Sequence, residues 1–151
     1  MKFAQSADEI FDVVNDRDEV IGQRTRGEVF LQKRSMKKDT FPGAWDSSAS
    51  GHLDSGEEYA ACALRELREE IGLNVAELPI VLCKIEACAE TGQEFVRVYR
   101  CEAEGPFELH PEEIETGDWF VPEAVTRWMA ERPQDFARAL LLIWKMFTAK
   151  S

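Results

Sequence analysis

The decisive stretch of this 151-residue chain reads Gly51-His52-Leu53-Asp54-Ser55-Gly56-Glu57 and resumes as Arg65-Glu66-Leu67-Arg68-Glu69-Glu70-Ile71-Gly72-Leu73. Apolar residues recur every three or four positions through it, which predicts a helix over 57–71 with one face on a core. Asp54 or Ser55 can cap the start of this helix, and Gly72 stands where a glycine ends helices.

Three carboxylates gather on one side of the predicted helix. Glu66, Glu69 and Glu70 are spaced so that their side chains project together. Like charges at such spacings destabilise a bare helix by roughly 0.2–0.5 kcal/mol per pair. A divalent cation would neutralise them, and an all-oxygen ligand set favours Mg²⁺ or Mn²⁺ over Zn²⁺. Arg65 can hold one carboxylate through a fork of charge-assisted hydrogen bonds.

The same residues match the Nudix box position for position: Gly, five residues, Glu, seven residues, Arg-Glu, an apolar residue, any residue, Glu-Glu, any residue, Gly and an apolar residue. Every specified place is filled, by Gly51, Glu57, Arg65, Glu66, Leu67, Glu69, Glu70, Gly72 and Leu73. The chain therefore resembles the Nudix hydrolases. A competing interpretation, a solvated helix with an acidic outer face, is kept for Glu58 and Arg68 only.

The resemblance extends beyond the box. The chain is similar to the Nudix subgroup nearest to isopentenyl-diphosphate isomerase at Phe30-Leu31-Gln32-Lys33-Arg34-Ser35, Phe41-Pro42-Gly43-Ala44-Trp45-Asp46 and Ser50-Gly51-His52. This resemblance implies a single Nudix domain over 1–151. Its fold would be of the α/β class, a Nudix-type α/β/α sandwich with a mixed sheet.

The resemblance also implies a metal-dependent hydrolase that cuts a diphosphate linkage in a nucleoside diphosphate or related nucleotide derivative. Water would attack phosphorus at a Mg²⁺ or Mn²⁺ site. Glu66 or Glu69 would orient or deprotonate that water, and Arg65 would orient a catalytic glutamate. The residues implied as metal ligands are Glu66, Glu69 and Glu70, with Glu57 (which alternatively supports the loop), the backbone of Gly51, and Glu113 from the later acidic group Glu112, Glu113 and Glu115.

Substrate contacts are expected from strand-end cations and aromatic residues. Lys33 and Arg34 are candidates for binding substrate phosphates. Trp45, together with Phe41 and Trp119, is a candidate for stacking on a nucleobase, although core or loop packing competes at each position. Cytidine and uridine diphosphates are the first substrates to test.

Two other functions compete with hydrolysis. An isopentenyl-diphosphate isomerase would carry a catalytic cysteine before the box glycine, where this chain has Ser50. A Nudix-fold module that binds a nucleotide without turnover would usually lack box carboxylates, and none is missing here. Turnover of a diphosphate panel separates these alternatives.

Composition limits the partners and the cellular location that can be expected for this chain. The net charge of −11 argues against a nucleic-acid partner, and no apolar run is long enough for a membrane helix. The 4 cysteines form no CxxC pair and only 2 histidines are present, which argues against a zinc site and for reduced thiols. A cytoplasmic protein with a small-molecule partner is expected.

Outside the box, strands are predicted over 10–14, 20–25, 29–33, 80–89, 95–101 and 116–121. Asn15-Asp16-Arg17-Asp18 has the composition of a turn, and 35–50 that of a long loop. The hairpin between 80–89 and 95–101 would turn at Glu90-Thr91-Gly92-Gln93. Two further helices are predicted over 122–132, beginning at Pro122, and over 135–150.

One segment expected in this subgroup is absent. About twenty residues, the length of a strand plus a connection, would normally stand between Arg26 and Gly27, which are here consecutive. The sequence leaves open a natural shortening, an engineered deletion or a break in the numbering. An intact chain would fill the gap in its sheet with a strand shifted from around Val20, or by strand exchange in a homodimer.

Overall fold

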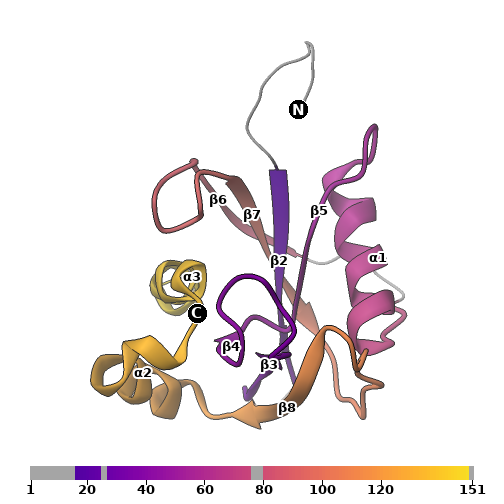
Figure 1. Cartoon of the computed structure of the whole chain (residues 1–151). Coiled ribbons are helices and arrows are strands. Elements are labelled where there is room, and N and C mark those ends of the chain that lie inside the picture. Colours follow the sequence, from indigo (N-terminus) through magenta and orange to yellow (C-terminus); the bar gives the residue numbers. More distant parts are fainter. Residues whose placement is uncertain (1–15, 25–26, 76–79, 150–151) are drawn as a thin grey trace.

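The computed structural model describes residues 16–24, 27–75 and 80–149. Helix α1 (Tyr59–Ile71) covers one face of a central sheet. Helices α2 (Pro122–Glu131) and α3 (Arg138–Ala149) cover the other face (Figure 1). This three-layer arrangement confirms the α/β/α sandwich predicted from the sequence. No helix in the described ranges is long and apolar enough to cross a membrane.

The sheet is mixed, as predicted. Its order is β4-β3-β2-β7-β6, with β5 also paired to β2 and β8 paired to β3. The β2–β7 pair is parallel and the others are antiparallel. The strands are β2 (Asp16–Gln23), β3 (Val29–Arg34), β4 (Trp45–Asp46), β5 (Ala49–His52), β6 (Ile80–Ile85), β7 (Phe95–Glu102) and β8 (Ile114–Phe120).

Strand β2 lies at the centre of this sheet. It pairs with β7 from Asp16 to Gln23 on one edge, and with β5 and then β3 on the other. Val20 and Ile21 are fully buried and pack into separate cores on the two faces. The predicted turn is therefore wrong at Asp16–Asp18, because pairing with β7 overrides local turn preference. Asn15, Thr25 and the strand predicted over 10–14 lie outside the described residues.

The described residues on either side of the expected missing segment are hydrogen-bonded to one another. The Gly27 N–H donates to the Arg24 carbonyl (2.8 Å), and the Arg24 N–H donates to the Glu28 carbonyl (3.0 Å). Gly27 has φ +91°, a conformation that glycine adopts without strain. Strand β2, which contains Val20, lies at the centre of the sheet, and its shift into the place of a missing strand stays a prediction. The Arg26–Gly27 bond lies outside the described residues, and strand exchange between copies remains a prediction.

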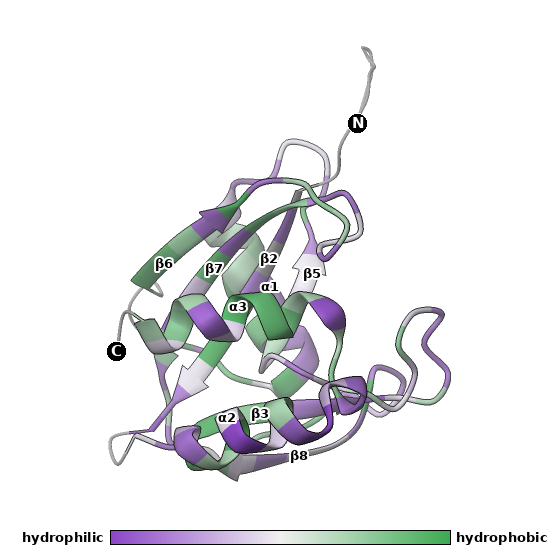
Figure 2. Cartoon of the chain, turned by 90° about the vertical axis from the view of Figure 1, so that its left-hand side faces the viewer, coloured by the Kyte–Doolittle hydropathy of each residue, from purple (hydrophilic) through white to green (hydrophobic). Residues whose placement is uncertain are grey.

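Each face of the sheet carries its own apolar core. The α1 side buries Leu67 and Ile71 against Val20 and Tyr99. The opposite side packs α3, including Trp144, against the sheet. Figure 2 shows the apolar residues of α3 and β6 in green. On one edge of β2 the first half pairs with β5 and the second half with β3, so the sheet splits there. Because helices cover both faces of the sheet, we expect a site to open at this split.

The observed elements differ from the sequence predictions mainly at their ends. Helix α1 begins at Tyr59 rather than residue 57 and has no side-chain cap, whereas Gly72 ends it as predicted with φ +69°. Strands β4 and β5 lie within and at the end of the predicted loop 35–50. Strand β6 ends at Ile85, so its connection to β7 is longer than the predicted turn. Helix α3 begins at Arg138, after a 3₁₀ turn over Pro133–Asp135.

Candidate active site

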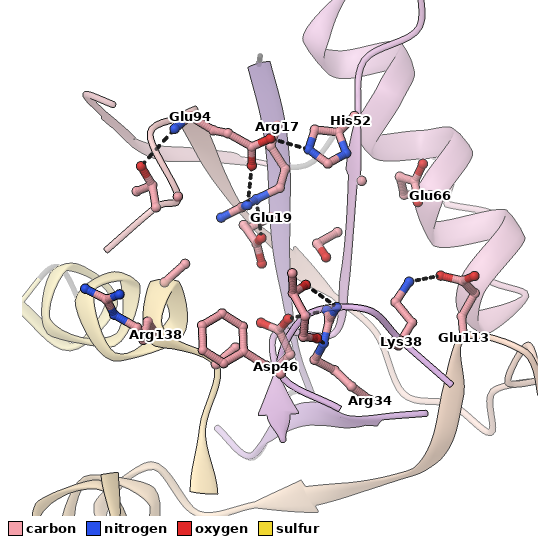
Figure 3. Close-up of a pocket in the computed structure, with 18 of the residues that line it drawn as sticks. Arg17, Glu19, Arg34, Lys38, Asp46, His52, Glu66, Glu94, Glu113 and Arg138 are labelled. Carbon is pink, nitrogen blue, oxygen red and sulfur yellow. Dashed lines mark hydrogen bonds and ion pairs between the residues drawn. The ribbon is translucent and has the colours of Figure 1, made fainter. Parts of the chain in front are cut away.

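A charged cleft of about 670 Å³ opens where the sheet splits. Helix α1 supplies one wall with Glu66, Glu69 and Glu70. Strands β2 and β5 and the segment after β3 form the floor, while the β6–β7 connection and the start of α3 close the far side. Figure 3 shows the side chains that point into this cleft. The cleft brings together only some of the box residues and of the lysine and arginine side chains that the sequence predicts as substrate contacts.

Two of the box carboxylates are buried in the α1 wall. Glu66 and Glu70 are each 7% exposed, whereas Glu69 is exposed. A Glu70 oxygen accepts hydrogen bonds from Gln32 Nε2 (3.0 Å) and from the Ser50 N–H (3.3 Å). Burial, followed by the neighbouring Glu66 carboxylate, holds the pKa of Glu70 well above its usual range. This contact between two acids favours a proton or a cation between them.

Arg65 joins the remaining box carboxylates. Its Nε and Nη2 donate to the two oxygens of Glu57 at 2.8 and 2.9 Å. Its Nη1 donates to Glu66 (2.7 Å) and Glu69 (3.2 Å). The fork with Arg65 lowers the pKa of Glu57 to about 2, so Glu57 is ionised. Because a Glu57 oxygen also accepts from the Asp54 N–H (2.9 Å), Glu57 fixes the loop before α1.

Gly51 lies directly against the Glu66 carboxylate. A Cβ at this position would be 2.1 Å from Glu66 Cδ and 2.3–2.4 Å from both of its oxygens. No side chain fits there, so the box glycine is required by close approach rather than by its φ angle. The backbone of β5 and the Glu66 carboxylate together form one edge of the candidate metal site.

The donor set fits a hard divalent cation, although it is not fully assembled. Among the described residues, no three histidine, cysteine or acidic side chains converge on one point. Glu66 and Glu70 form the prepared part, and a cation would offset the burial and the Glu66 contact that raise the pKa of Glu70. Glu69 bonds Arg65 and has a side chain 53% exposed, so it can turn toward a cation by rotating. All available donors are oxygens, as Mg²⁺ and Mn²⁺ prefer.

An ionic quartet forms the opposite part of the cleft: Arg17, Glu19, Arg34 and Asp46 (Figure 3). Arg17 Nε lies 2.9 Å from Glu19, and Arg34 Nη1 donates to Asp46 at 3.1 Å. Ser47 joins the two acids, because its hydroxyl donates to Glu19 and its N–H donates to Asp46. Burial and the Asp46 charge raise the pKa of Glu19 to about 7, and burial also raises that of Asp46.

Glu94 links this quartet to the rim of the cleft. Its carboxylate accepts a hydrogen bond from Arg17 and pairs with His52 Nε2. The hydrogen bond with Glu94 raises the pKa of His52. The connection between β6 and β7, which contributes Thr91 and Gly92 to the cleft, is thereby fastened to β2 and β5.

The predicted substrate-binding residues separate in the structure. Arg34 lines the cleft, whereas Lys33 pairs with Glu115 (3.6 Å) and lies outside it. Trp45 also lies outside, with ring centroids 5.2 Å from Phe120 and 5.7 Å from Trp128. Substrate contacts by Lys33 and Trp45 remain predictions that this geometry does not support.

The predicted distant acid reaches the cleft. Glu113 lines it and forms an ion pair with Lys38, next to α1 (Figure 3). Glu112 pairs instead with Lys37 on the surface. Metal binding by Glu113 stays a prediction, and it requires Glu113 to leave Lys38.

Sequence reasoning did not single out several cleft residues, namely Arg17, Glu19, Asp46, Lys38, Glu94 and Arg138. Arg17 belongs to the segment interpreted as a turn, and Glu19 directly follows it. The parallel register that aligns Glu19 with Val98 brings them to the cleft, and this register is a tertiary property. One available signal was the run of four consecutive charged residues over 16–19, which can indicate a set of interacting charges.

The structure has a mixed sheet between helices and, in its cleft, a pair of glutamates with a glycine packed against one of them. This is the architecture of a Nudix domain. A model of the NUDIX domain matches residues 17–140. The chain therefore belongs to the Nudix hydrolase family.

Relatives of known sequence agree. An uncharacterized Nudix hydrolase of Yersinia pestis is 32% identical over 155 positions, which cover 87% of this chain and 83% of the relative. Escherichia coli YfcD, also an uncharacterized Nudix hydrolase, is 29% identical over 170 positions, covering 93% and 88%. Because that alignment is longer than this 151-residue chain, it includes YfcD residues that have no counterpart in this chain.

Isopentenyl-diphosphate Delta-isomerase of Paenarthrobacter aurescens is 31% identical over 116 positions, covering 74% of this chain and 63% of the isomerase. Solved structures show the same fold. The crystal structure of DR0079 from Deinococcus radiodurans has a TM-score of 0.71 at 27% identity, covering 78% of this chain and 73% of that one. The NUDIX domain of Shewanella oneidensis NrtR, complexed with ADP ribose, has a TM-score of 0.75 at 15% identity, covering 93% and 90%.

Proposed function

We propose that this chain is a diphosphohydrolase that uses Mg²⁺ or Mn²⁺ to cleave the diphosphate linkage of a nucleoside diphosphate or related nucleotide derivative. The observation that carries the proposal is the buried Glu66–Glu70 pair beside Arg65, facing a cleft whose other wall carries cations. A bound divalent cation would neutralise charge that develops on the diphosphate during attack by water.

The chain's own residues divide the remaining work. Arg65 fixes the Glu66 carboxylate through a 2.7 Å hydrogen bond, which makes Arg65 a positioning residue. Gln32 and the Ser50 N–H hold Glu70 in place. Glu66 or Glu69 is proposed to accept the proton of the attacking water.

Metal ligation is proposed for Glu66, Glu69 and Glu70 with the Gly51 backbone, and for Glu113 once it leaves Lys38. Glu57 is committed to Arg65 and is proposed to support the loop. Arg34 and Lys38 also line the cleft and are proposed to supply positive charge for phosphate oxygens. None of the four cysteines forms a disulfide bond in the described residues, which suits the reducing cytoplasm that we propose.

The test is a panel of nucleoside diphosphates, nucleoside triphosphates, diphosphate-linked nucleotides and isopentenyl diphosphate, each incubated with Mg²⁺ or Mn²⁺. Release of phosphate or monophosphate is measured by phosphorus NMR. We expect release from at least one nucleotide, and only when metal is present. No release from any member would contradict the proposal and favour a nucleotide-binding module. Isomerisation of isopentenyl diphosphate would favour the isomerase.

A further inference from the structure

Phe41 is exceptional among the residues that line the cleft. The described lining residues are otherwise charged, polar or small, and Phe41 is the one large apolar side chain among them. It is 43% exposed, although an aromatic ring of this size normally gains free energy by burial. An exposed ring at the rim of a charged cleft is available to contact an apolar surface of a ligand.

The backbone of Phe41 is held in an unfavourable conformation. Its φ is +48°, in the left-handed region that bulky residues rarely occupy. Such strain persists only where the surroundings impose it, and it concentrates at functional sites. The Ala44 N–H donates to the Phe41 carbonyl at 3.1 Å and closes the turn that carries the ring. The backbone that carries the exposed Phe41 ring is therefore held by a closed turn.

Arg34 holds the residue immediately before Phe41. Its Nε donates to the Thr40 carbonyl at 2.9 Å and its Nη2 donates to Thr40 Oγ1 at 3.1 Å. Its Nη1 is anchored on the buried Asp46 at 3.1 Å. Through these contacts the ionic quartet on the cleft floor sets the direction of the Phe41 turn, which reduces the ordering that a ligand must impose.

Phe41 also lines a second hollow, of about 390 Å³, together with residues that include Lys33, Trp45 and Gln134. Phe41 thus lines both the cleft and the second hollow, and we call it the ridge between them. A substrate whose diphosphate lies beside Glu66 and Glu70 can extend its organic group along this ridge.

The other aromatic candidates are already engaged. Trp45 packs on Phe120 and Trp128. Trp119 contacts Phe30, and Arg24 Cζ lies over the Trp119 ring at 4.3 Å from its centroid. Neither lines the cleft. Among the described residues, Phe41 is the one phenylalanine, tyrosine or tryptophan that lines the cleft.

We propose that Phe41 is the platform on which the heterocyclic base of a nucleotide substrate stacks, and that Arg34 is the positioning residue for this platform. The inference rests on the proposed function, since it assumes that the diphosphate lies at the α1 carboxylates. It adds to that function the residue on which the base of the substrate would rest and the residue that would position it.

Equilibrium dialysis with CMP, UMP, AMP and GMP, each compared with ribose 5-phosphate, tests the platform without requiring turnover. The protein is kept in Mg²⁺ throughout. We expect at least one monophosphate to bind about tenfold or more tightly than ribose 5-phosphate, as one base–aromatic stack provides. Phe41→Ala should remove this preference, and Phe41→Trp should keep it. Phe95→Ala, at an exposed aromatic residue outside the cleft, is the matched control and should leave the preference unchanged.

Two outcomes overturn the inference. In the first, the protein binds no nucleoside monophosphate more tightly than ribose 5-phosphate. In the second, Phe41→Ala keeps the wild-type preference. Failure of the proposed function looks different. A protein that shows the Phe41-dependent preference and hydrolyses no diphosphate keeps the platform and loses the hydrolase. A protein that hydrolyses diphosphates without any base preference keeps the hydrolase and loses the platform.

Discussion

Arg65 holds Glu57 through two parallel hydrogen bonds of 2.8 and 2.9 Å, so the first carboxylate of the box is neutralised by the protein itself. Glu66 and Glu70, by contrast, contact each other in a buried position that raises the pKa of Glu70. The box therefore contains two kinds of glutamate. One kind fixes the loop and the arginine, and the other presents a charge that an external cation can neutralise.

Arg65→Lys should weaken catalysis more than binding. A lysine can contact one carboxylate but cannot form the fork with Glu57 while also holding Glu66. We expect kcat to fall about tenfold or more with a smaller change in KM, and the free energy of unfolding to fall by about 1–2 kcal/mol. Steady-state kinetics and urea unfolding measure both. Arg68→Lys, on the exposed side of α1, is the control. Wild-type kcat in Arg65→Lys would show that the fork does not position Glu66.

Gly51→Ala should displace Glu66. The added Cβ would lie 2.1 Å from Glu66 Cδ, so the carboxylate has to move. We expect kcat/KM to fall about 100-fold, the usual effect of misplacing a reacting group by an ångström. Gly22→Ala is matched, because its Cβ would meet Ser48 at an ordinary 3.5 Å. Equal activity in the two variants would mean that Glu66 has room that this structure does not show.

Glu19 should make stability depend on pH. Its pKa in the folded protein is about 7 against an ordinary 4.5, so the folded state holds the proton more tightly than the unfolded state. The free energy of unfolding should therefore fall as pH rises from about 4.5 to 7. Glu19→Gln should remove about 2–3 kcal/mol of that fall.

Urea unfolding of wild type and Glu19→Gln at pH 5 and pH 8, both with EDTA, measures this difference. The raised pKa of Glu70 acts in the same direction in both proteins, so it cancels in the comparison. Parallel pH profiles for the two proteins would show that Glu19 titrates normally in the fold.

The sequence predicted what depends on local spacing. Helix α1, its end at Gly72 and the position of Arg65 beside its glutamates follow from contacts no more than eight residues apart. These contacts are encoded within one segment. The Nudix box therefore identified both the family and the acidic wall of the cleft.

The sequence did not predict what depends on strand register. Arg17 and Glu19 reach the cleft because β2 aligns with β7, although the charges of this segment suggest a turn. Neighbouring residues on a strand face opposite sides. Lys33 and Arg34 therefore separate, and so do Trp45 and Asp46, with only the second of each pair lining the cleft. Composition alone could not say which member faces the substrate.

The most direct test of the central claim, that the α1 carboxylates hold the metal that hydrolysis requires, is the rate of phosphate release as Mg²⁺ is added to metal-stripped wild type and Glu70→Gln. Glu58→Gln, at an exposed position before α1, is the control. Wild type and Glu58→Gln should be inactive without Mg²⁺ and should reach the same saturating rate. Glu70→Gln should stay at least about 100-fold lower, while its metal-free stability stays level or rises because repulsion with Glu66 is relieved. Wild-type turnover by Glu70→Gln at saturating Mg²⁺ would contradict the assignment.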